Sequence, residues 1–245
     1  MKSVRILDAD FAPLTTRQTL DQIFQLIARG ERGYLCTINV AILMIMRSNA
    51  RLRRFISRAW LSVADGAPLV WASRLMGAPL PERVTGVDLV EQLCEGAAER
   101  GLGVYLLGAK PEIVARVAER LTSRYPGLRI AGYADGYFDA EQAASRADDV
   151  RESGAKLLIV AMGVPRQEYF LEDHWARLGV NFAIGVGGSF DVLAGLRKRA
   201  PVFLQTAGLE WVFRLCQEPR RLFARYLVTN SQFLFLITRR LIRGR

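Results

Sequence analysis

Short apolar runs alternate with longer amphipathic segments along most of the chain, and this alternation predicts the fold class. The runs typical of buried strands cover residues 4–7, 34–39, 61–64, 103–107, 128–132, 156–161 and 182–186. Segments with apolar residues at helical spacing cover residues 16–28, 41–47, 52–58, 68–76, 89–100, 111–124, 140–152 and 167–178. Strand–helix–strand units of this length require crossover connections. We therefore predict an α/β protein with a Rossmann-like, mostly parallel sheet flanked by helices.

Polar residues and glycines follow the predicted strands at six places. In parallel α/β sheets, ligands bind outside the carboxyl ends of the strands. The residues expected at this edge are Thr37, Asn39, Asp65, Gly108, Tyr137, Gln167 and the segment 187–191. One such residue is expected in any α/β protein, whereas six places favour a ligand site.

Residues 182–191 combine a predicted strand, a glycine-rich turn and a helix start. Gly185, Gly187 and Gly188 permit backbone angles and close approaches that a side chain would prevent. Ser189 is expected to cap the helix, with Asp191 in its first turn. A turn of this kind commonly holds a phosphate or ribose. Its sequence is not the GxGxxG dinucleotide pattern, and no P-loop motif occurs in the chain.

The positive charge of the chain is concentrated at its C-terminal end. Residues 196–245 contain ten Arg and one Lys against two acids, which gives +9 of the formal net charge of +10. We therefore predict an α/β catalytic domain at residues 1–195 and a basic, mainly helical appendage at residues 196–245. The arginines alternate with large apolar residues, which favours an anionic membrane surface over nucleic acid. The longest apolar stretch of the appendage, residues 226–238, contains four polar residues and predicts no spanning helix.

Cysteine and histidine usage limits the chemistry. The three cysteines lie far apart and form no CxxC pair, which predicts free thiols in a reducing compartment. The single histidine, His174, cannot form a metal cluster alone, and no DxD pair follows a strand. The N-terminal residues lack the apolar core of a signal peptide. We therefore expect a protein on the cytoplasmic side that needs no metal or other cofactor.

Several of these side chains have both a functional and an ordinary interpretation. Asp65 at a strand end suits a general base for a hydroxyl nucleophile, or equally a turn residue. Arg83 suits a diphosphate clamp or a surface salt bridge. Glu168 opens a helix where backbone donors can meet an anion, or it is an ordinary first-turn acid. Asp191 could accept from a ribose or favour its own helix N-terminus. Tyr137 could stack on a base or pack in the core.

The order and spacing of several short motifs resemble the WecG/TagA/CpsF family of bacterial glycosyltransferases. The resemblance covers residues from about 35 to 226. Its motifs are Thr37-x-Asn39, Ala64-Asp65-Gly66, Arg83-x-x-Gly-x-Asp88, Leu107-Gly108, Gly136-Tyr137-Phe138, Gly163-x-Pro165-x-Gln167-Glu168, Gly185-Val-Gly-Gly-x-Phe-Asp191, Arg199-Ala-Pro201, Gly208-Leu-Glu-Trp211 and Glu218-Pro-Arg-Arg221.

This resemblance implies an inverting, metal-independent transfer of a hexose-type sugar from a UDP-sugar to a polyprenyl-diphosphate-linked sugar. The sugar would be N-acetylmannosamine, its uronic acid, glucuronic acid or a similar hexose, and the pathway cell-surface polysaccharide synthesis. The resemblance implies that Asp65 is the base and that the catalytic pocket also contains Thr37, Asn39, Arg83 and Gln167. The implied substrate-binding residues are Gly108, Tyr137, Gln167, Glu168, Gly187, Asp191, Arg214 and Arg221. The expected location is the cytoplasmic face of the membrane, with the protein bound peripherally.

Two other classes of function stay open from the residues alone. One is a nucleotide-dependent oxidoreductase, which the missing dinucleotide fingerprint disfavours. The other is a non-enzymatic basic module that binds nucleic acid, because aromatic–arginine surfaces can bind single strands. The oligomeric state is open as well, a homo-oligomer included.

Overall fold

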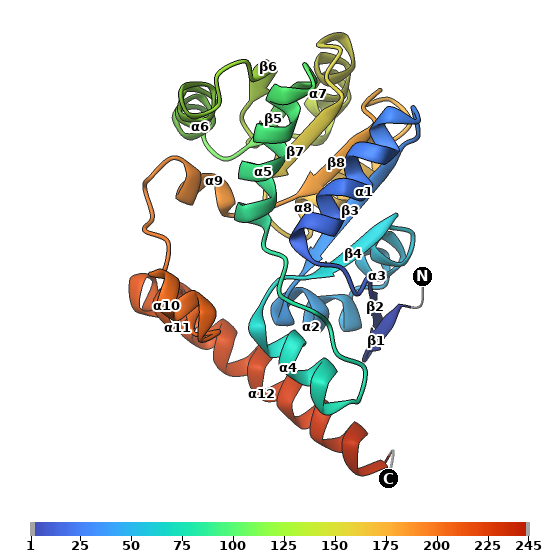
Figure 1. The fold of residues 1–245 in the computed structure, drawn as a ribbon, viewed down its shortest axis with the longest axis vertical. Helices are drawn as coiled ribbons and strands as arrows, with labels where there is room; N and C mark the ends of the chain where they lie inside the picture. Colours follow the sequence, from blue (N-terminus) through green and yellow to red (C-terminus); the bar gives the residue numbers. More distant parts are fainter. Residues whose placement is uncertain (1–2, 244–245) are drawn as a thin grey trace.

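The computed structural model describes residues 3–243, apart from the side chains of Arg221 and Arg225. Its centre is a six-stranded sheet in the order β4-β3-β8-β7-β5-β6, in which every neighbouring pair of strands is parallel (Figure 1). The strands are β3 (Gly33–Ile38), β4 (Leu61–Ala64), β5 (Gly103–Gly108), β6 (Arg129–Ala134), β7 (Leu157–Ala161) and β8 (Phe182–Gly185). This confirms the predicted parallel α/β sheet. A separate hairpin, β1 (Val4–Ile6) and β2 (Ala9–Phe11), precedes it, and its second strand was not predicted.

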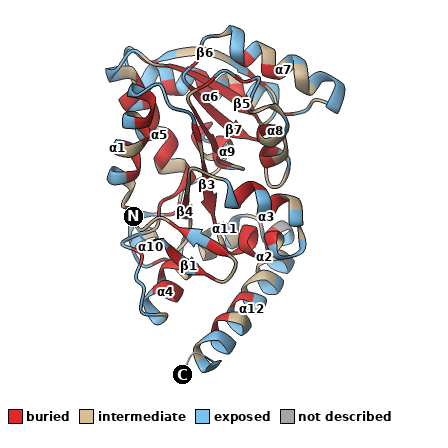
Figure 2. Ribbon diagram, turned by 90° about the vertical axis from the view of Figure 1, so that its right-hand side faces the viewer, coloured by how far each residue is buried: buried red, intermediate tan, exposed pale blue. Residues whose placement is uncertain are grey.

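Helices cover both faces of the sheet. The helices that precede the C-terminal segment are α1 (Thr16–Ala28), α2 (Val40–Ser48), α3 (Ala50–Ser57), α4 (Ala67–Leu75), α5 (Gly86–Glu99), α6 (Pro111–Arg124), α7 (Ala140–Glu152), α8 (Arg166–His174) and α9 (Ser189–Leu193). Successive strand residues point to opposite faces, so Leu157 and Ile159 pack with α1, α5 and α6, whereas Leu158 and Val160 pack with α2, α7 and α8. The sheet thus separates two buried clusters of apolar side chains. Figure 2 colours the buried residues of the strands and helices red.

Three helices form the C-terminal segment, which we call the appendage (residues 196–243). They are α10 (Val202–Thr206), α11 (Glu210–Gln217) and α12 (Pro219–Arg243). The long helix α12 packs against α2, and its Phe233 and Ile237 are buried in the same cluster as α2 side chains (Figure 1). This confirms the mainly helical appendage. Within residues 3–243, no helix is both long and apolar enough to cross a membrane.

The structure corrects two local predictions. The helix expected over residues 167–178 ends at His174, and a turn follows. Ser189 does not cap α9, because Gly188 occupies the N-cap position and the Ser189 hydroxyl donates instead to the Val186 carbonyl oxygen at 2.8 Å. By contrast, helices α6 and α7 begin and end at the predicted residues.

We expect the packing of α12 on α2 to contribute strongly to stability. The side chain of Phe233 is 3% exposed, so Phe233→Ala should lower the free energy of unfolding by about 3 kcal/mol through lost burial and a residual cavity. Two residues further along, Phe235 is 66% exposed, and Phe235→Ala should change it by less than about 0.5 kcal/mol. Urea unfolding of both variants measures the difference. Equal values would show that α12 is not part of the folded core.

Candidate active site

A cavity of about 330 Å³ opens beyond the carboxyl ends of β3, β4 and β8. Pockets for small ligands usually have volumes in this range or above it. One wall comes from the sheet and its loops, with Thr37, Asn39, Asp65, Arg83, Gln167 and Gly187 among its residues. The opposite wall belongs to the appendage and includes Glu210, Trp211, Arg214, Tyr226 and Asn230. The cavity therefore exists only because the appendage lies over this edge of the sheet.

Asp65 directly follows β4 and is half-buried at the cavity wall. Its backbone N–H donates to the Ile38 carbonyl oxygen at 2.8 Å, which continues the ladder between β3 and β4 and fixes the direction of the chain. Gly66, with φ of 137°, then turns the backbone into α4. The Asp65 carboxylate is thus held at a strand end by backbone geometry, as the sequence predicted.

The pKa of Asp65 is raised to about 6. Burial is the largest cause, because removal of water disfavours the carboxylate. The nearby positive charge of Arg214 lowers the pKa, the negative charge of Glu210 raises it, and Arg83 lowers it again. The carboxylate is therefore mainly ionised at neutral pH and still basic enough to accept a proton, which suits a general base.

Thr37 and Asn39 connect β3 to the cavity. The Thr37 hydroxyl is buried and donates to the Gly185 carbonyl oxygen on the neighbouring strand β8 at 3.2 Å. The side-chain oxygen of Asn39 accepts from the Ile42 backbone N–H at 3.1 Å and so caps α2. The Asn39 side chain is thereby fixed at the cavity wall.

The glycine-rich turn after β8 is held by Gln167. The backbone N–H of Gly187 donates to the side-chain oxygen of Gln167 at 3.0 Å, and φ at Gly187 is 53°. The side-chain nitrogen of Gln167 in turn donates to a carboxyl oxygen of Glu168 at 2.8 Å. Gln167 borders the cavity, whereas Glu168 lies behind it and does not line it.

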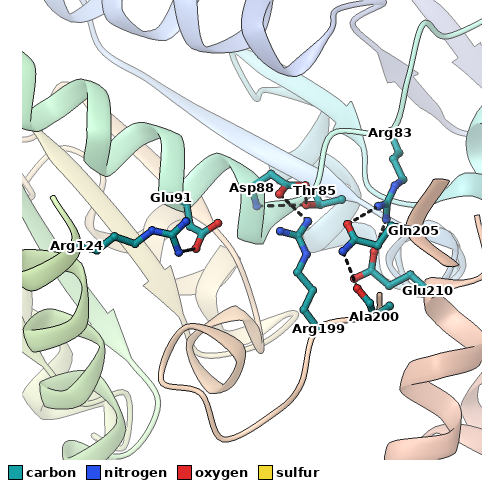
Figure 3. A network of polar contacts seen from close by, with 9 residues as sticks. All are labelled: Arg83, Thr85, Asp88, Glu91, Arg124, Arg199, Ala200, Gln205 and Glu210. Carbon is teal, nitrogen blue, oxygen red and sulfur yellow. Dashed lines mark hydrogen bonds and ion pairs between the residues drawn. The ribbon is translucent and has the colours of Figure 1, made fainter. Parts of the chain in front are cut away.

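Ion pairs join the appendage to the helices and loops that flank the sheet, as Figure 3 shows for two of them. Arg83 pairs with Glu210 of α11 and also donates to the Gln205 side-chain oxygen of α10 at 3.2 Å. Arg199 pairs with Asp88 of α5 at 2.5 Å. Arg83 is therefore held in the cavity by a carboxylate of the appendage, at a position where an anionic ligand would meet it.

Arg197 makes the third connection. Its guanidinium pairs with Asp191 of α9 at 3.0 Å and with Glu218, next to α12, at 2.6 Å. Asp191, which the sequence suggested as a ribose acceptor, is thus in an ion pair in this structure. The link between α9 and α10 is fixed to both parts of the chain.

The structure brings together most of the predicted site residues. Those that line the cavity are Thr37, Asn39, Asp65, Arg83, Gln167, Gly187 and Arg214, and those that do not are Gly108, Tyr137, Glu168 and Asp191. Tyr137 is 67% exposed after β6. At Gly108, φ is 138° and an added Cβ would lie 2.4 Å from the Ala161 carbonyl oxygen, so glycine is required there for backbone packing. The side chain of Arg221 lies outside the described residues.

Sequence reasoning placed several cavity residues of the appendage in no substrate or catalytic site. These are Lys198, Arg199, Glu210, Trp211, Leu222, Tyr226 and Asn230. One signal could have identified part of this set. Leu222, Tyr226 and Asn230 recur every fourth residue, which places them on one face of a helix. Among the described residues, the structure contains no group of three or more His, Cys, Asp or Glu side chains that could hold a metal ion.

A parallel α/β sheet with a half-buried carboxylate and four arginines around a cavity at its carboxyl edge suits an enzyme that acts on phosphorylated ligands. Residues 4–245 match the Glycosyl transferase WecG/TagA/CpsF family, and the chain belongs to this family. Membership makes it a glycosyltransferase of cell-surface polysaccharide synthesis. The family acts in general with a sugar nucleotide as donor and a lipid-linked acceptor.

Proposed function

We propose that this enzyme transfers a hexose-type sugar, with inversion, from a UDP-sugar to a sugar linked to polyprenyl diphosphate. The candidate sugars are N-acetylmannosamine, its uronic acid, glucuronic acid and similar hexoses. The observation that carries the proposal is the half-buried Asp65 carboxylate, whose pKa of about 6 is set in a cavity shared with Arg83 and Arg214. A base for the acceptor hydroxyl and cations for the leaving diphosphate can together support a single displacement at a sugar–diphosphate bond.

In this mechanism Asp65 accepts the proton of an acceptor hydroxyl while the hydroxyl oxygen attacks the anomeric carbon. The bond from that carbon to the UDP oxygen breaks on the opposite side of the ring, which inverts the configuration. Negative charge then develops on the diphosphate, and cations fixed in advance stabilise it without reorganisation. Arg83 and Arg214 are the residues proposed for this role.

Arg83 already has a carboxylate partner on the appendage. Its guanidinium pairs with Glu210, and the side chains of both residues are 20% exposed. A diphosphate carries more negative charge than one carboxylate, and its oxygens suit the planar guanidinium. We propose that the donor displaces Glu210 from Arg83. Contacts of Tyr137 and Asp191 with the nucleotide, and of Arg221 with the acceptor, stay predictions from the family pattern.

The proposed location is the cytoplasmic face of the membrane, where the lipid-linked acceptor would be reached. Helix α12 supports this proposal, because it exposes several large apolar side chains. They are Phe223, Leu227, Val228, Leu234, Phe235 and Ile242. Arg220, Arg239, Arg240 and Arg243 of the same helix are exposed as well. Apolar residues beside arginines suit the headgroup region of an anionic bilayer.

Replacement of the proposed base should abolish most of the transfer. Asp65→Asn is expected to lower turnover by ~10²–10⁴-fold, the usual contribution of positioned proton transfer, while UDP still binds. The wild-type kcat/KM should fall about tenfold per pH unit below about pH 6, because the base must be ionised. Release of UDP in a purified assay measures both. Asp173→Asn, at an exposed site on α8, is the control, and near-normal turnover by Asp65→Asn would exclude the role.

Transfer should not depend on a metal ion. We propose that arginines rather than a cation stabilise the leaving diphosphate, so the rate should be unchanged in excess EDTA. The assay is the same UDP release, with and without added Mg²⁺ or Mn²⁺. Loss of activity in EDTA that either ion restores would contradict this proposal.

The full chain should bind vesicles of anionic lipid at low salt. Each arginine near such a surface contributes about 1 kcal/mol, and the interaction weakens as salt increases. Replacement of both Leu234 and Phe235 by Ser should reduce binding without unfolding, because both side chains are more than 60% exposed. Flotation with and without anionic lipid, at low and high salt, measures this. A folded wild-type protein that stays at the bottom at low salt would refute membrane attachment.

A further inference from the structure

The side chain of Gln167 is held at both ends of its amide group. Its oxygen accepts from the Gly187 backbone N–H at 3.0 Å, and its nitrogen donates to the Glu168 carboxyl group at 2.8 Å. Gln167 itself is 2% exposed. These two hydrogen bonds define which end of the amide is oxygen and which is nitrogen. The orientation of Gln167 therefore depends on Glu168 and on the turn after β8.

Strand β8 leaves the space that this side chain occupies. A Cβ atom added at Gly185 would lie 2.5 Å from the amide nitrogen of Gln167 and 2.9 Å from its carbonyl carbon. The same glycine accepts the hydroxyl of Thr37 through its carbonyl oxygen at 3.2 Å. Any side chain at position 185 would thus displace the amide from its two partners.

Glu168 is buried behind Gln167, away from the cavity that contains Asp65. Its side chain borders an enclosed space of about 10 Å³ together with mainly apolar residues of β3, α2 and α3. One carboxyl oxygen accepts from Gln167, and the other has no hydrogen-bond partner among the described residues. The pKa of Glu168 is raised to about 7: burial raises it most, while hydrogen bonds from the Gln167 side chain and from the Glu168 backbone lower it. Cys36 of β3 is the titratable group that faces it. An uncharged carboxylic acid is the form that suits this environment.

We infer that Glu168 is a positioning residue: it fixes the amide of Gln167, which in turn holds the Gly187 turn at the rim of the catalytic cavity. The inference rests on the proposed function, and it gives Glu168 a different role from direct contact with substrate. The turn borders the space for the donor. Because the turn is already fixed before the diphosphate binds, less conformational entropy is lost on binding.

The variants below distinguish three possible contributions of Glu168: its hydrogen-bond acceptor, its side-chain volume and its charge. Glu168→Met fills a similar volume without a hydrogen-bond acceptor, so the protein should fold with an unchanged or higher melting temperature. It should weaken the binding of UDP about tenfold, as expected when a positioning hydrogen bond is lost. Glu168→Gln keeps a neutral acceptor and should restore UDP affinity to within about threefold. Glu172→Met on the same helix, which breaks the Arg51 pair instead, is the matched control.

A second readout does not depend on any activity. The side-chain amide of Gln167, labelled with ¹⁵N and assigned from its absence in Gln167→Ala, should exchange slowly in the wild type and in Glu168→Gln. It should exchange rapidly in Glu168→Met and in Gly185→Ala, which displaces the same amide without touching Glu168. Titration calorimetry with UDP and amide exchange by NMR together complete the experiment.

The outcomes distinguish the inference from the proposed function. If the wild type does not bind UDP, the proposed function fails, and the exchange data alone decide whether Glu168 orients Gln167. If the wild type binds UDP and a folded Glu168→Met protein binds equally well with a protected Gln167 amide, the inference is overturned. It is also overturned if Glu168→Gln is as impaired as Glu168→Met, because the carboxyl group would then act through its charge.

Discussion

Ion pairs between the arginines of the appendage and the acids of the sheet domain complete the cavity. The chain is nearly neutral up to residue 195, and most of its excess charge follows. Arg197 and Arg199 of the appendage form ion pairs with Asp191 and Asp88. In the third pair the charges are reversed, because Glu210 of the appendage binds Arg83. Isolated surface pairs contribute little to stability. These pairs are partly buried at a domain edge, where loss of one partner leaves the other charge unpaired at considerable cost.

Burial raises the pKa of two carboxyl groups in this region, and their surroundings give them different chemistry. Asp65 lies beside Arg214 and Arg83, so it stays largely ionised at neutral pH despite its loss of water. Glu168 lies among apolar side chains, and its hydrogen-bonded side-chain partner among the described residues is the Gln167 amide, so its neutral form is favoured more strongly. One group suits the acceptance of a proton and the other suits the orientation of a neighbour.

Local patterns in the sequence were sufficient to predict the strands of the sheet and the cavity residues that directly follow those strands. Alternating apolar runs give strand positions directly, and backbone geometry at a strand end then places residues such as Asp65 and Thr37. The other half was not accessible in this way. The partners Arg83 and Glu210 are separated by 127 residues, and no local spacing reveals such a contact. The prediction that Ser189 caps the helix was wrong, because its hydroxyl donates to the Val186 carbonyl oxygen within the tight turn.

Helix α12 packs against α2 with one part of its length and borders the cavity with another. Its Phe233 and Ile237 share a buried cluster with α2, and α2 begins at the cap residue Asn39 on the cavity wall. Closely packed side chains have low compressibility, so they transmit displacement rather than absorb it. Helix α12 therefore contacts the cavity in two ways: directly through Leu222 and Tyr226, and indirectly through the helix that Asn39 caps.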